Sequence, residues 1–210
     1  MIHKVLGNKR KGRVFIVSAP AGTGKTTLVD MIKEEFPFIV QSISYTTRKP
    51  RGKEVNGVDY FFISHEEFQQ KIVNEDFLEY VRLYDQSYGT SRAWVEEQLE
   101  SGNHVVLVID TQGAMKLKKR IDSVSIFVTP PSFEELKSRL IERRTDSHEN
   151  ISLRLEWAKK ELLHAKYYDY EIVNDDLKIA YDVLRSIFIA EEHRVINYKG
   201  ESDGFTKSAV

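Results

Sequence analysis

The sequence predicts an α/β fold in which a parallel sheet is flanked by helices. Short apolar runs rich in β-branched residues alternate along the chain with segments of helical period. Most of these runs lack the polar–apolar alternation of a half-exposed strand, which is typical of parallel strands covered on both faces. The chain has 210 residues, of which 41% are hydrophobic, enough for one domain with an insertion.

The predicted core begins with a strand at residues 13–18. A helix follows after Lys25, because Leu28, Ile32 and Phe36 fall on one stripe, and Pro37 ends it. Further strands are predicted at residues 38–44, 105–109, 124–129 and 170–173.

Two segments interrupt the core pattern. Residues 44–91 are rich in aromatic and turn residues, with a hairpin signal at Asn56-Gly57 and a capping-box pattern at Ser64 and Glu67. Residues 133–167 form a helical excursion that follows a second capping-box pattern, Ser132 and Glu135. We therefore expect one domain over residues 1–196, with a core at about 12–43, 92–132 and 168–196, an inserted mixed α/β subdomain at about 44–91 and a helical lid at about 133–167. Residues 197–210 are expected to be a flexible tail.

Composition excludes several classes of protein. Lys and Arg total 31 against 32 Asp and Glu, so global charge does not indicate a nucleic-acid or membrane partner. Cysteine is absent, which excludes disulfides, thiolate zinc sites and cysteine nucleophiles. No apolar run approaches the ~18 residues of a membrane span, and the basic N-terminus lacks the apolar stretch of a signal peptide. We expect a soluble cytoplasmic protein.

Residues 19–26 match a phosphate-binding loop. They read Ala19, Pro20, Ala21, Gly22, Thr23, Gly24, Lys25 and Thr26, between a predicted strand and a predicted helix. Ala19 occupies the first glycine position of the pattern. Backbone N–H groups of such a loop surround phosphate oxygens, Lys25 supplies a mobile cation, and Thr26 supplies a hydroxyl ligand for Mg²⁺.

Asp110 follows the apolar run 105–109. An acidic residue at the tip of a buried strand suits a role in holding Mg²⁺ through water. An ordinary turn residue at a strand end is the alternative.

A longer set of motifs resembles the guanylate kinase family. The run S-x-T-T-R-x-P-R from residue 44 is followed by E-V-N-G-x-D-Y (54–60), F-L-E-Y (77–80), Y-G-T (88–90), I-D-T-Q-G (109–113) and V-N-D-D (173–176). The resemblance covers residues 12–194 without a large gap.

This resemblance implies transfer of the γ-phosphoryl group of ATP to GMP, with Mg²⁺ as cofactor and dGMP as a further acceptor. The positions that match the GMP site lie mostly in the segment 44–91: Ser44, Arg48, Arg51, Tyr60, Glu79, Tyr88, Thr90 and Asp110. Arginine forks and tyrosine hydroxyls are suited to a phosphomonoester. A carboxylate such as Glu79 accepts from the two adjacent donors of guanine. Taken alone, the arginines also fit a solvated basic turn, and Glu79 a surface carboxylate.

The segment 133–167 carries further arginines. Arg139 and Arg143 share a helix face, and by resemblance Arg139, Arg143 and Arg154 match lid arginines that stabilise the transferring phosphoryl group. Together with Lys25 and Arg48 they are the expected catalytic residues. The alternative for Arg139 is a surface ion pair with Glu135. Arg144 replaces the family's usual glycine, and Asn174 matches a position near the adenine of ATP.

Two other functions stay open from the sequence. One is a non-catalytic module of the same fold that binds phosphopeptides. The other is a nucleoside-monophosphate kinase that prefers a different base, a choice that depends on Glu79. The sequence leaves monomer and homo-oligomer equally open.

Overall fold

The computed structural model describes residues 5–7, 11–83, 85–142 and 148–195, and for residues 148–150 only the backbone. The predicted tail, 197–210, and two of the predicted lid residues, Arg143 and Arg144, lie outside the described residues.

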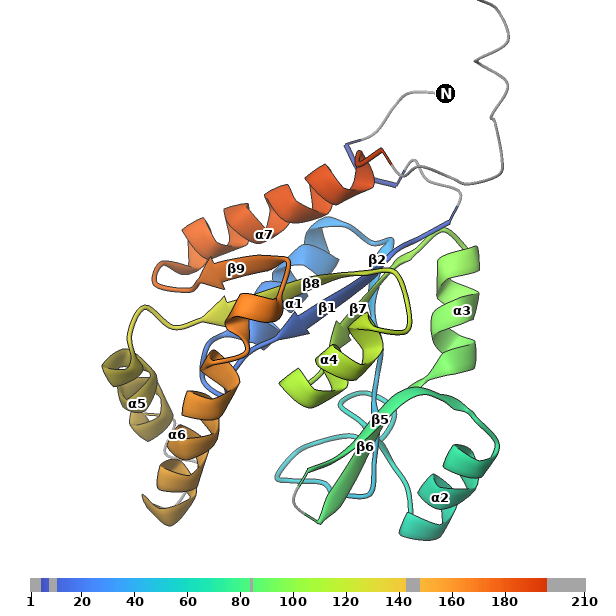
Figure 1. Cartoon of the computed structure of the whole chain (residues 1–210), viewed down its shortest axis with the longest axis horizontal. Helices are drawn as coiled ribbons and strands as arrows, with labels where there is room; N and C mark the ends of the chain where they lie inside the picture. Colours follow the sequence, from blue (N-terminus) through green and yellow to red (C-terminus); the bar gives the residue numbers. More distant parts are fainter. Residues whose placement is uncertain (1–4, 8–10, 84, 143–147, 196–210) are drawn as a thin grey trace, which may run out of the picture.

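The main sheet is parallel and has five strands. These are β1 (Val14–Ser18), β2 (Ile39–Gln41), β7 (His104–Val108), β8 (Ser123–Thr129) and β9 (Tyr170–Val173), in the order β2-β7-β1-β8-β9. Every pairing between them is parallel. The predicted α/β class is confirmed (Figure 1).

Helices cover both faces of this sheet. Phe15 and Val17 of β1 pack with α1 (Lys25–Glu35) and α7 (Leu177–Glu192), while Val14 and Ile16 pack with α3 (Arg92–Glu100) and α4 (Thr111–Lys118). Successive residues of β1 thus enter two different hydrophobic clusters. This is why the strand sequence has no polar alternation.

A second, mixed sheet lies beside the first. Its strands are β3 (Tyr45–Thr46), β4 (Phe61–Phe62), β5 (Phe77–Leu83) and β6 (Gln86–Ser91), in the order β4-β3-β6-β5. Helix α2 (His65–Val73) packs on it through Phe68, whose ring centroid lies 4.6 Å from that of Phe77. In Figure 1 this layer hangs below the main sheet, next to α4.

Two sequence predictions within residues 38–62 are wrong. The predicted strand 38–44 stops at Gln41 and the chain then crosses to the second sheet, where it forms β3. Asn56-Gly57 forms no hairpin: Gly57 N donates to the Tyr60 carbonyl at 2.8 Å, and β4 pairs in parallel with β3. The Asn56 side chain accepts from Phe62 N at 2.8 Å, which closes a compact turn instead.

The chain between β8 and β9 is helical. It forms α5 (Phe133–Glu142), α6 (His148–Leu162) and a 3₁₀ turn, η1 (Ala165–Tyr167), with a small hydrophobic core of its own around Leu136 and Leu140. Ser132 Oγ accepts from Glu135 N at 3.0 Å, while the Glu135 carboxylate accepts from Arg139. The capping box predicted at Ser64 and Glu67 is complete. Among the described helices, none is long and apolar enough to cross a membrane.

Candidate active site

A cavity of about 1270 Å³ opens at the carboxyl ends of β1 and β7, and β5, β6 and α6 also contribute to its wall. This is the edge at which open parallel sheets bind ligands. Most of the predicted site residues line it: Ala19, Pro20, Ala21, Gly22, Thr23, Gly24, Lys25, Thr26, Ser44, Arg51, Tyr60, Glu79, Tyr88, Asp110 and Arg154. Three further predicted residues contact the lining: Arg48 at Tyr60, Thr90 at Glu79 and Asn174 at Thr23. Arg139 contacts Asn174, and Arg143 is outside the described residues.

The loop between β1 and α1 has the backbone that its sequence predicts. Gly22 and Gly24 have φ angles of 93° and 83°, a region that favours glycine. Ala19 is buried, so its methyl group fits at the first position of the loop. Thr23 Oγ1 donates to the Pro20 carbonyl at 3.0 Å, which closes the loop. Helix α1 begins at Lys25 and directs its N-terminus toward this loop.

Asn174 supports the loop from behind. This buried residue donates from Nδ2 to the Thr23 carbonyl at 2.7 Å. The main-chain carbonyl of Asn174 accepts from Arg139 Nη1 at 3.0 Å, and Arg139 Nε also donates to the Glu135 carboxylate at 2.9 Å. The ion pair considered as an alternative for Arg139 is therefore present. The predicted roles of Arg139 and Asn174 toward ATP stay predictions.

Lys25 lies near the carboxylates of Glu161 and Asp110. Its Nζ donates to the Ala19 carbonyl at 3.4 Å. Burial lowers the pKa of Lys25, and the nearby carboxylates of Glu161 and Asp110 oppose this shift. Burial likewise raises the pKa of Glu161 to about 7, with Lys25 acting in the opposite direction. Glu161, on α6, is not predicted as a site residue, because nothing in the local sequence distinguishes it from other helical glutamates.

Asp110 is held at the end of β7 as the N-cap of α4. Its Oδ1 accepts from Gln112 N at 2.6 Å and from Gly113 N at 3.0 Å. Capping fixes the carboxylate at the wall of the cavity that Thr26 also lines, near Lys25 of the phosphate loop.

Glu79 is a buried carboxylate, with 4% of its surface exposed. Its Oε1 accepts from Thr90 Oγ1 at 2.7 Å, and its Oε2 has no hydrogen-bond partner. Burial raises the pKa of Glu79 to about 7, and Asp110 adds to the increase. Because Glu79 is buried, the surface-carboxylate alternative is excluded. A buried oxygen without a hydrogen-bond partner also requires an explanation. A ligand with hydrogen-bond donors supplies one.

Arg48 is buried behind the cavity wall. Its guanidinium forms a bidentate pair with Glu54, at 2.7 and 2.9 Å, and lies 5.0 Å from the centroid of the Tyr60 ring. This pairing raises the pKa of Arg48 further above its ordinary range. Glu54 also accepts from Arg51 N at 2.7 Å, so one carboxylate organises both arginines of the loop. Glu54 belongs to the motif at residues 54–60, and nothing in the local sequence indicates this role.

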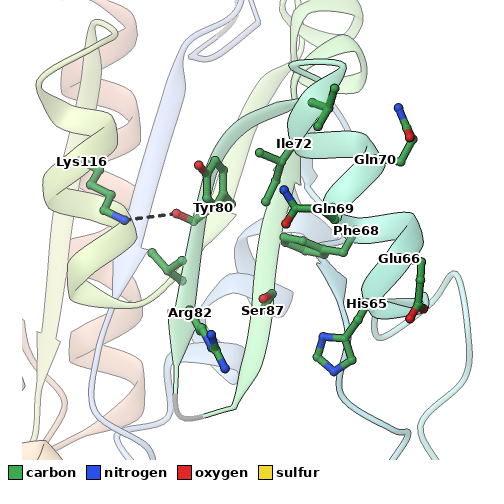
Figure 2. Close-up of a pocket in the computed structure, with 12 residues that line it drawn as sticks. His65, Glu66, Phe68, Gln69, Gln70, Ile72, Tyr80, Arg82, Ser87 and Lys116 are labelled. Carbon is green, nitrogen blue, oxygen red and sulfur yellow. Dashed lines mark hydrogen bonds between the residues drawn. The ribbon is translucent and has the colours of Figure 1, made fainter.

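A second hollow, of about 820 Å³, lies between α2 and the strands β5 and β6 (Figure 2). Tyr80 turns into it because successive residues of a strand point to opposite faces, whereas Glu79 points into the first cavity. Lys116 of α4 donates from Nζ to the Tyr80 carbonyl at 3.3 Å. None of the predicted site residues lines this hollow.

A phosphate loop at the edge of a parallel sheet, facing an acceptor pocket with a buried carboxylate, defines a P-loop kinase that acts on a small acceptor. A sequence model of the family described as guanylate kinase matches residues 11–191. The chain belongs to the guanylate kinase family, and is thus a nucleoside-monophosphate kinase.

Individual relatives agree. A guanylate kinase of Protochlamydia amoebophila is 62% identical over 189 residues, which cover 90% of this chain and 96% of the relative. A guanylate kinase of Chlamydia abortus is 50% identical over 183 residues, which cover 87% of this chain and 90% of the relative. The crystal structure of guanylate kinase from Anaplasma phagocytophilum is 34% identical, covers 89% of each chain and superposes with a TM-score of 0.73.

Proposed function

We propose that this chain transfers the γ-phosphoryl group of ATP to GMP, giving ADP and GDP, inside the 1270 Å³ cavity. Membership of the guanylate kinase family accounts for the reaction. The observation that carries the choice of acceptor is Glu79, a buried carboxylate whose Oε2 has no partner and which lies in the same cavity as the phosphate loop.

The donor phosphates bind at the loop 19–24. Its backbone N–H groups and the N-terminus of α1 attract phosphate oxygens, and Lys25 supplies the cation. Asn174 maintains the loop through the Thr23 carbonyl. Because no group has to reorganise when charge moves toward the leaving oxygen, this cradle favours the transition state.

The acceptor phosphate binds opposite, at Arg51 and the hydroxyls of Tyr60 and Tyr88, which line the cavity. Arg48 completes this cluster from behind, oriented by Glu54. Guanine carries two adjacent donors, N1–H and the exocyclic amine, which the ionised Glu79 carboxylate accepts. Adenine presents an acceptor at N1 and would leave the carboxylate unpaired. Thr90 orients Glu79, and Ser44 lies at the same wall.

The residues present fit a magnesium ion carried with ATP. Mg²⁺ prefers oxygen ligands, keeps several waters and usually takes one or two protein ligands besides phosphate oxygens. Thr26 offers a hydroxyl, and the capped Asp110 a carboxylate that acts through water, on walls of one cavity. When bound, the ion neutralises charge on the β- and γ-phosphates.

We assign residues 44–91 to GMP binding and residues 133–167 to a lid that carries Arg139, Arg143 and Arg154. Closure of such a lid excludes water and brings cations to the transferring group. We further expect dGMP to serve as an acceptor, because no group of the proposed site requires the 2′-hydroxyl, and we expect the protein to act in the cytoplasm.

A coupled assay of ADP release tests the proposal, with GMP, AMP, UMP and CMP as acceptors. We expect kcat/KM for GMP to exceed that for the other three nucleotides by at least about 10⁴-fold, as for a site that hydrogen-bonds its substrate's polar groups. In the Glu79→Gln variant, kcat/KM for GMP should fall by at least about 10-fold, and kcat/KM for AMP should fall by less. Turnover with another base would assign a different acceptor, and binding of phosphopeptides without turnover would favour the non-catalytic module.

A further inference from the structure

Gly113 of α4 lies close to both carboxylates of the acceptor pocket. Its N–H donates to Asp110 Oδ1 at 3.0 Å. On its other side, a Cβ atom placed on Gly113 would lie 2.8 Å from Glu79 Oε2 and 3.5 Å from its Cδ. Real Cβ atoms essentially never approach another heavy atom within 3.0 Å, so any side chain at this position must displace the carboxylate.

The displaced atom is the one that the base needs. Glu79 Oε1 is held by Thr90 at 2.7 Å, so Oε2 is the oxygen left for a ligand. Glu79 is 4% exposed, and its other carboxylate oxygen is held by Thr90, so a shift of the carboxylate changes either the direction of Oε2 or this hydrogen bond. A methyl group at Gly113 therefore either turns Oε2 away from the pocket or breaks the hydrogen bond from Thr90.

The helix is fastened at this distance from the strand. Lys116 lies one turn beyond Gly113 on the same face of α4, and its Nζ donates to the Tyr80 carbonyl of β5 at 3.3 Å. At the other end, Asp110 caps α4 where β7 ends. These two contacts hold α4 beside β5 and oppose the shift that would make space for a side chain at Gly113.

We propose that Gly113 is a positioning residue that determines base specificity: the missing side chain lets α4 approach β5 so closely that Glu79 Oε2 stays aimed at guanine. The inference rests on the proposed role of Glu79 and assigns a purpose to a residue that makes no contact with substrate in that scheme. Glycine weakens a helix, so alanine at this position would favour α4 if only the helix mattered.

The first experiment compares Gly113→Ala with the wild type, using GMP and IMP as acceptors. IMP keeps N1–H and lacks the exocyclic amine, so it depends less on the exact placement of the carboxylate. We expect kcat/KM for GMP to fall by about 10-fold or more, as for a misplacement of up to an ångström. The ratio of kcat/KM for GMP to kcat/KM for IMP should decrease. The KM for ATP and the thermal unfolding temperature should stay close to their wild-type values. Unchanged GMP kinetics, or equal losses with both acceptors, would overturn the proposal.

The second experiment holds even if Gly113→Ala alone does not fold. The Glu79→Ala change removes the atoms that the new Cβ would meet, so the double variant Glu79→Ala/Gly113→Ala has space at the contact. We expect it to fold and to match Glu79→Ala in kcat/KM for GMP within about 2-fold, since coupled sites are non-additive. A further loss of about 10-fold would show that Gly113 acts through something other than Glu79. If Glu79→Ala itself leaves the GMP-to-AMP ratio unchanged, the assigned role of Glu79 fails instead.

Discussion

Asn174 Nδ2 lies 2.7 Å from the carbonyl oxygen of Thr23, which ties the last strand of the sheet to the phosphate loop. A Cβ on Gly24 would come within 2.4 Å of the same Nδ2 atom. Gly24 therefore serves two purposes, because it takes a φ of 83° and leaves space for this amide.

Replacing Asn174 by alanine should weaken both the fold and ATP binding. The buried Thr23 carbonyl would lose its donor, which costs about 1–3 kcal/mol of unfolding free energy. The loop would also lose its support, so KM for ATP should rise more than KM for GMP. Denaturant unfolding and initial rates measure these effects. Asn74→Ala, at the surface end of α2, is the matched control, and equal behaviour of the two variants would contradict the assignment.

Replacing Lys25 by alanine should remove activity without unfolding the protein. A preorganised cation is lost from the charge-bearing phosphates, so kcat should fall by at least about 100-fold. Lys25 has a pKa lowered by burial, so its removal relieves a desolvation cost and should not destabilise the fold. Lys33→Ala, on the same helix and paired with Asp30, should behave like the wild type. Near-normal turnover by a folded Lys25→Ala protein would refute its role.

Glu54 is expected to act on GMP affinity through Arg48. Glu54→Gln keeps the shape but loses one acceptor of the bidentate pair and its charge. KM for GMP should rise about 3- to 10-fold while kcat changes little, because a ground-state binding contact is weakened. Glu66→Gln, on the exposed surface of α2, is the control. A loss confined to kcat would place Arg48 in the transition state rather than in acceptor binding.

The pH dependence of GMP binding should report Glu79. Its pKa is raised to about 7, so the carboxylate that accepts guanine is depleted below that pH and affinity falls as pH falls. The same shift stabilises the folded protein at low pH, and this contribution is lost as pH rises from about 4.5 through 7. Calorimetric titration with GMP at pH 5.5–8.5 measures this pH dependence. The same titration of Glu79→Gln gives the part that comes from the phosphate of GMP, so the difference between the two proteins is the part that comes from Glu79. Identical pH profiles would exclude the assignment.

A buried pair at the opposite end of the sheet should contribute to the pH dependence of stability. His104 Nδ1 accepts from Arg13 N at 3.0 Å, so Nε2 carries the proton and donates to Glu192 at 2.7 Å. Burial lowers the pKa of His104, so as pH falls below about 6.5 the unfolded chain takes up a proton more readily than the folded protein. The contribution of His104 to the free energy of unfolding should therefore fall below that pH, by up to about 1.4 kcal/mol per pH unit.

The variant His104→Gln isolates this effect. Glu79 and Glu161 have raised pKa values and contribute the opposite slope, so the difference between wild type and variant is the informative quantity. We expect urea titrations at pH 8, 6.5 and 5.5 to show that the unfolding free energy of the wild type minus that of His104→Gln decreases as pH falls. A difference that does not vary with pH would contradict the neutral state of His104.

Local sequence determined the parts of the site that are contiguous in the chain. The phosphate loop is one such part, because the φ angles of Gly22 and Gly24 and the start of α1 at Lys25 follow from residues within one turn. The strands of the main sheet were predictable for a similar reason, since a strand covered on both faces is apolar throughout. The motif around Glu79 indicated guanine, through resemblance to a family.

Only the tertiary structure decided which distant groups meet. The desolvation of Glu79, the approach of Gly113 to its Oε2, the support of Thr23 by Asn174 and the placing of Glu161 near Lys25 join residues from different elements. The turn at Asn56-Gly57 was misread for the same reason: its conformation depends on pairing of β4 with β3. Sequence patterns report burial and local backbone preference, whereas pKa shifts and close contacts arise from what packing brings within a few ångströms.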